Sequence, residues 1–167
     1  MARLLAPLAI VLIAAAPLVD TGSGTLAFSF AADDLQTETL FGPEADSEAV
    51  VSVRQAPDGV ADVRISVRAL VEAEGVRYRA SADVSARSLS GALAEGDLIG
   101  LASQSTALLD TEGAVVRTSR RVRATDVRVR VSRLTDTEVH GDFVITSERD
   151  GLTRVSGSFV APRPADV

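Results

Sequence analysis

The chain has 167 residues, a formal net charge of −6 and no cysteine, and arginine is its only strongly basic residue type. The lack of cysteine excludes disulfide bonds, thiolate metal sites and a cysteine nucleophile. The acidic balance argues against nucleic acid as a partner, because binding to phosphates needs a basic surface that displaces counterions.

The first residues have the composition of an export signal. Arg3 supplies one positive charge, and the stretch Leu4–Val19 that follows is uncharged. A transmembrane helix needs about 20 apolar residues, and the prolines in this stretch weaken a stable span. We therefore predict a signal peptide over residues 1–24, with the cut somewhere between residues 16 and 31. The alternative is an uncleaved anchor in the inner membrane; either way the domain is expected in the periplasm or outside the cell.

The rest of the chain alternates between apolar and polar residues. Val63, Ile65 and Val67 alternate with polar residues, and the pattern is unbroken from Val76 to Ala86. A period of two is typical of a strand with one buried face. The pattern predicts strands near 24–31, 48–55, 60–71, 76–87, 98–109, 114–124, 127–134, 138–147 and 152–161.

Short turns link the predicted strands. Pairs such as Glu74-Gly75 and Asp150-Gly151 leave gaps that force antiparallel neighbours. We predict a single all-β domain over 25–161, an antiparallel meander of about eight or nine strands in an up-and-down or partly open barrel; the alternative is a two-sheet sandwich. The polar residues on one face of most strands argue against an integral outer-membrane barrel.

Three segments break the simple strand pattern. Segment 32–47 is expected to be a long acidic loop that could hold one short helix. The prolines near the C-terminus predict a disordered tail over 162–167. The apolar positions switch from even to odd numbers around Thr125-Asp126, which predicts a bulge or a tight corner there.

Arginines gather on both sides of that predicted corner. Arg121 and Arg123 share one face, and Arg128 and Arg130 share another set of polar positions. Arginine pairs in a bidentate manner with carboxylate, phosphate or sulfate groups, so these four residues are candidate binding residues for an anionic partner. The alternative is a solvated outer face that acids on neighbouring strands neutralise, with Asp83 and Asp142 as candidates.

No catalytic or metal site is predicted. The only histidine, His140, lies near Asp142 on the polar face of its strand, and such a pair could orient a general base. No nucleophile elbow accompanies it, so a solvated pair is the simpler interpretation. Acidic loop clusters lack the spacing of a calcium loop, and nothing points to a cofactor.

Small residues at inward positions leave two interpretations open. Ala80, Ala82, Gly141 and Gly157 could leave a cavity for an apolar ligand, or they could permit close packing of sheets. We predict a non-catalytic exported module that binds a small apolar or amphipathic ligand, or an anionic partner such as an envelope polymer through its arginines. The alternatives are a structural or adhesin-like envelope component and, third, an unrecognised hydrolase.

Overall fold

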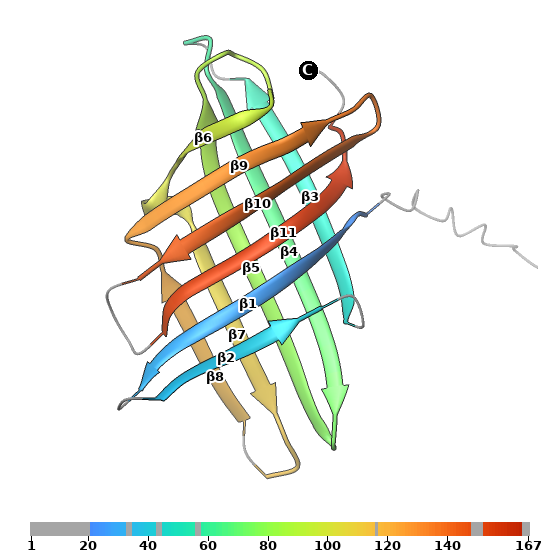
Figure 1. Cartoon of the computed structure of the whole chain (residues 1–167), viewed down its shortest axis with the longest axis vertical. Coiled ribbons are helices and arrows are strands. Elements are labelled where there is room, and N and C mark those ends of the chain that lie inside the picture. Colours follow the sequence, from blue (N-terminus) through green and yellow to red (C-terminus); the bar gives the residue numbers. More distant parts are fainter. Residues whose placement is uncertain are drawn as a thin grey trace, which may run out of the picture.

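The protein is an all-β barrel with an open seam (Figure 1). The computed structural model describes residues 21–32, 35–42, 45–55, 58–115, 117–147 and 152–164, and all statements below concern these residues. They form eleven antiparallel strands in the order β2-β1-β11-β10-β9-β6-β5-β4-β3, with β7 on β5 and β8 on β7. The strands are β1 (Ser23–Ala32), β2 (Leu35–Phe41), β3 (Asp46–Gln55), β4 (Ala61–Ala73), β5 (Val76–Ser88), β6 (Gly96–Gly100), β7 (Thr106–Glu112), β8 (Arg117–Arg123), β9 (Asp126–Leu134), β10 (Glu138–Thr146) and β11 (Leu152–Pro162).

The strands lie in two layers that face each other across the core. We call β3, β4, β5, β7 and β8 the first layer, and β2, β1, β11, β10 and β9 the second layer. Figure 1 shows the strands of one layer crossing those of the other. The predicted barrel is confirmed in its partly open form, since two connections join the layers and a seam remains elsewhere.

The first connection between the layers is the short strand β6. It pairs with the end of β5 on one side and with β9 on the other. Gly100 allows this crossing, because a Cβ atom there would lie 2.1 Å from the carbonyl oxygen of Val127. A side chain at this position would therefore push β6 away from β9.

The second connection is made at the start of β1 and by the two residues before it. The backbone of Gly22 exchanges two hydrogen bonds of 2.9 Å with that of Ala49 on β3, and the Gly24 amide donates to Ser47 Oγ. A Cβ atom on Gly22 would lie 1.8 Å from the Val160 carbonyl oxygen, so only glycine fits. We call residues 21–24 the N-terminal latch, because they tie the second layer to the edge of the first.

The long hairpin of β4 and β5 lies at the centre of the first layer. Its strands pair without a register shift from Ala61 with Ser88 to Ala73 with Val76. The two-residue turn Glu74-Gly75 has positive φ at both residues, as the favoured hairpin turn requires. Regular alternation and this turn together explain why the sequence predicts both strands of the hairpin to within two residues at each end.

The core fills the space that the inward glycines leave. Gly141 lies opposite Phe159, and Gly157 lies opposite Phe143, on the paired strands β10 and β11. A Cβ atom on either glycine would come within 2.6 Å of the facing ring. Each ring therefore lies over the glycine beside it, and at these two positions the structure favours close packing over a ligand cavity. The ladder between β9 and β10 also has a register shift between His140 and Gly141.

The structure corrects three sequence-based expectations. Residues 35–41 form β2 rather than part of an acidic loop or a helix. The predicted strand 98–109 is divided into β6 and β7 by a 3-10 turn at Ala102–Gln104. Pro162 ends β11 in register with Glu138, and Arg163 is hydrogen-bonded through its amide to the Thr137 carbonyl, so the ordered chain extends past residue 161.

Candidate binding surface

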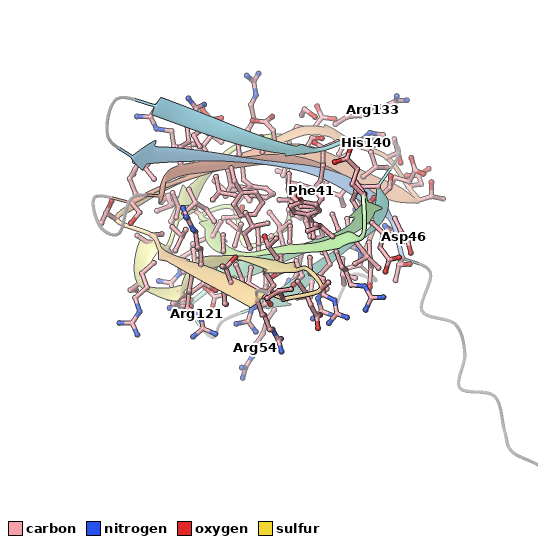
Figure 2. The ribbon with its side chains drawn as sticks, turned by 90° about the horizontal axis from the view of Figure 1, so that it is seen from below. Phe41, Asp46, Arg54, Arg121, Arg133 and His140 are labelled. Carbon is pink, nitrogen blue, oxygen red and sulfur yellow. The ribbon has the colours of Figure 1, made fainter. Side chains whose placement is uncertain are left out.

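The four predicted binding arginines lie on two different layers. Arg121 and Arg123 belong to β8, whereas Arg128 and Arg130 belong to β9. The chain turns between them at Thr125, whose amide donates to the Thr146 carbonyl, which confirms the predicted corner. Figure 2 shows Arg121 on one outer face and Arg133 and His140, which lie on β9 and β10, on the opposite face, with Phe41 between them. The arginines therefore do not form one continuous stripe.

The two predicted binding arginines on β9 have acidic neighbours. Arg128 Nε lies 3.5 Å from Asp126 Oδ2, in an ion pair whose side chains are 84% and 60% exposed. Arg130 lies in register with Asp142 on β10 and with Asp97 on β6. Opposite charges directly across a ladder are favourable, and exposed pairs of this kind contribute little. The neutral, solvated interpretation therefore fits β9.

Arg121 and Arg123 of β8 lie opposite Leu108 and Thr106 rather than an acid, whereas Arg117, at the end of the strand, lies opposite Glu112. Among the described residues, Arg117, Arg121 and Arg123 form no ion pair within 4 Å. The expected partner Asp83 accepts a hydrogen bond from Ser66 Oγ instead, and β7 separates it from β8. The acid predicted to neutralise these arginines is therefore engaged elsewhere.

β8 is also an edge strand. Its described backbone pairs with β7 on one side only, from Thr106 with Arg123 to Glu112 with Arg117. Val122 is its only buried side chain, at 2% exposure, and the rest of the strand is exposed. An edge strand offers alternate N–H and C=O groups to another chain, and charged side chains commonly protect such edges from self-association.

A hollow of about 440 Å³ lies on the outer face of β3, β4, β5 and β7. Ser81 lies near its centre, in register with Arg68 on one side and Leu108 on the other. Longer side chains surround this short one, which is why the surface is recessed there. We call it the Ser81 hollow; its lining is Asp46, Ser47, Glu48, Arg68, Ala69, Leu70, Arg79, Ala80, Ser81, Leu108 and Asp110.

The histidine contacts a different acid from the one considered above. His140 Nε2 lies 3.0 Å from Glu138 Oε2 on the same strand, and the histidine side chain is 27% exposed. Asp142 lies opposite Arg130. Within the described ranges, no group of three histidine or acidic side chains is placed to hold a metal ion.

Sequence reasoning missed the Ser81 hollow altogether. Leu70 is an apolar residue at an outward position of β4, where the other outward residues are polar, and Leu108 lies within the apolar sequence Ala107-Leu108-Leu109. Only the strand register brings Leu70, Arg79 and Leu108 to neighbouring outward positions. An outward leucine on an otherwise polar strand face was the one signal available.

Comparison with known proteins gives no match. No protein-family model, no curated protein and no solved structure matches this chain. Within the described residues, no helix has the length and apolar character needed to cross a membrane. The features that bear on function are therefore those of the surface of this chain.

Proposed function

We propose that this chain is an exported, non-catalytic binding module that holds an acidic, extended polypeptide segment along the free edge of β8. The observation that supports this most is the combination of an unpaired strand edge with three outward arginines that have no ion pair among the described residues. The uncharged stretch near the N-terminus supports export.

The backbone of β8 supplies the docking interaction. An extended peptide that adds a strand to a sheet edge gains main-chain hydrogen bonds, and its alternate side chains contact those of the edge strand. β8 has seven residues, a sufficient length for such pairing. A polysaccharide would use only the side chains, which is why a polypeptide fits this edge better.

The side chains of β8 supply the preference for acids. Arg117, Arg121 and Arg123 occupy odd-numbered positions, with Ser119 at the fourth, so they lie on the same face of the strand. An added strand with acids at alternate positions would place each carboxylate beside a guanidinium group. The arginines also repel a second β8, which disfavours pairing between two copies through this edge.

Binding of a synthetic peptide tests the proposal. The probe is a nine-residue peptide of alternating glutamate and valine, titrated into the folded domain by calorimetry at low and moderate salt. We expect the double variant R121Q/R123Q to bind about tenfold more weakly, since each exposed ion pair contributes up to about 1 kcal/mol. The matched control R128Q/R130Q removes the same charge from β9 and should bind as the unaltered chain does.

A second probe separates strand addition from simple charge attraction. A peptide of the same sequence with N-methyl groups on every backbone nitrogen keeps its carboxylates and loses its backbone donors. We expect it to bind much more weakly than the parent peptide. Equal binding of both peptides, or an equal loss in the two double variants, would contradict the proposal and favour a surface without a specific partner.

A further inference from the structure

We propose that the Ser81 hollow is a second binding site, and that it takes a single-chain zwitterionic amphiphile. The site does not depend on the function proposed for β8, because none of the arginines of β8 lines it. A volume of about 440 Å³ falls within the usual range for small-molecule sites.

Apolar side chains form part of the lining. Leu70 is 36% exposed on the outer face, where its strand otherwise presents polar residues, and Leu108 of β7 is half-buried. β5 separates the two leucines, and the short Ser81 lies between them. An alkyl chain placed along this line would cover apolar surface that now faces water, which is favourable.

Two arginines mark the place for an anionic group. Arg68 and Arg79 are on neighbouring strands, and among the described residues neither forms an ion pair within 4 Å. Their side chains approach the hollow from two sides of Ser81, whose hydroxyl can donate a further hydrogen bond. A phosphate or carboxylate between these groups would receive charge-assisted hydrogen bonds.

The acids of the lining select against a simple anion. Asp46 and Glu48 on β3 lie in register with Leu70 and Arg68, and Asp110 lies beside Arg79. β3 and β5 are separated by β4, a spacing of about 10 Å. A ligand with a cationic group toward β3 and an anionic group over Ser81 matches both sets of charges, whereas a ligand with one charge meets repulsion from one of them.

Titration with dodecylphosphocholine below its micelle concentration tests this site. Amide chemical shifts of the folded domain should change around Ser81, and dodecyl sulfate and dodecyltrimethylammonium should each bind at least about tenfold more weakly. Glycerophosphocholine, which lacks the alkyl chain, should also bind more weakly. Shifts that map elsewhere, or equal affinity for all three detergents, would overturn the proposal.

Filling the hollow gives a matched pair of variants. Ser81→Leu places a larger side chain at its centre, and Ser52→Leu adds the same side chain to an exposed outer-face position on β3 outside this hollow. We expect dodecylphosphocholine to bind about tenfold more weakly to the first variant and unchanged to the second. If Ser81→Leu fails to fold, the double variant R68Q/R79Q replaces it. Unchanged binding in the variant measured would refute the site.

Discussion

The two layers fill one core with different side chains. Among the side chains that the structure describes, the four buried phenylalanines, Phe28, Phe41, Phe143 and Phe159, all come from the second layer. The first layer contributes valines, Ile65 and most of the buried alanines: Ala49, Ala61, Ala69, Ala80, Ala82, Ala86 and Ala107. Large side chains on one side thus meet small ones on the other.

This difference shows how a barrel with few aromatic residues keeps a dense core. Facing sheets lie about 10 Å apart, a distance that rings from one side and methyl groups from the other can fill together. The outer faces differ as well. The β9 arginines of the second layer have acidic neighbours, whereas the first layer carries the free edge of β8 and the Ser81 hollow. We therefore expect the aromatic layer to contribute more to stability, while the alanine-rich layer carries both proposed binding surfaces.

Removing β1 should have the largest effect, because it deletes a central strand of the second layer. A chain that begins at Ala32 lacks Leu26 and Phe28, both fully buried, and loses the strand between β2 and β11. We expect no cooperative unfolding transition in urea, while a chain that begins at Thr21 should unfold in one step. A cooperative transition in the shorter chain would show that the second layer does not need β1.

The N-terminal latch restricts where the predicted signal peptide can be cut. Cutting after Gly24 or Ala31 would take away the N-terminal latch, and the latter would also remove most of β1. We therefore expect the mature chain to begin upstream of Gly22. Mass spectrometry of the exported protein measures this directly, and a first residue beyond Gly24 would contradict it.

Truncating one core side chain in each layer compares them directly. Phe143→Ala should lower the free energy of unfolding by about 3–5 kcal/mol. Val84→Ala in the first layer should lower it by about 2 kcal/mol, since fewer buried carbon atoms are removed. Urea denaturation measures both, and equal losses would show that the phenylalanine layer does not dominate the core.

Adding one methyl group tests the fit between rings and glycines. The Cβ atom of Gly157→Ala would lie 2.6 Å from both the Phe143 ring and the Thr25 carbonyl oxygen, so we expect a loss of about 1–3 kcal/mol. The neighbouring change Ser156→Ala has its side chain on the other face of β11 and should alter stability by less than about 0.5 kcal/mol. A stable Gly157→Ala variant would mean that the rings can move aside.

The smallest effect is expected on β8. The double variant R121Q/R123Q changes two exposed side chains without ion pairs among the described residues, so its free energy of unfolding should shift by less than about 0.5 kcal/mol. Thermal unfolding followed by circular dichroism measures this. A larger loss would assign these arginines to the stability of the first layer.

Much of the fold was accessible from local sequence patterns. The alternation in β4 and β5 and the turn at Glu74-Gly75 predicted the long hairpin, because each local signal agrees with the burial of one face. The switch of apolar positions from even to odd numbers predicted the corner at Thr125. These features depend on residues close together in the chain.

The remaining features depend on contacts between distant residues. β2 has threonines at positions paired with Phe28 and Phe30, so its sequence lacks a clear apolar alternation. The split between β6 and β7 arises because β6 also pairs with β9; the polar run 103–106 marks the interruption but not the change of partner strand. Likewise, Arg121 and Arg128 are seven residues apart in the sequence but lie on different layers. The residues that line the Ser81 hollow are brought together only by the pairing register of their strands.

The first and last described strands are direct neighbours, from Ser23 opposite Val160 to Phe30 opposite Leu152. The barrel therefore cannot assemble until nearly the whole chain has been synthesised, and such high contact order slows folding. A nascent chain with this topology cannot complete its barrel while its C-terminal residues are still being made. That delay would suit a polypeptide that must be threaded through a narrow secretion channel before it folds.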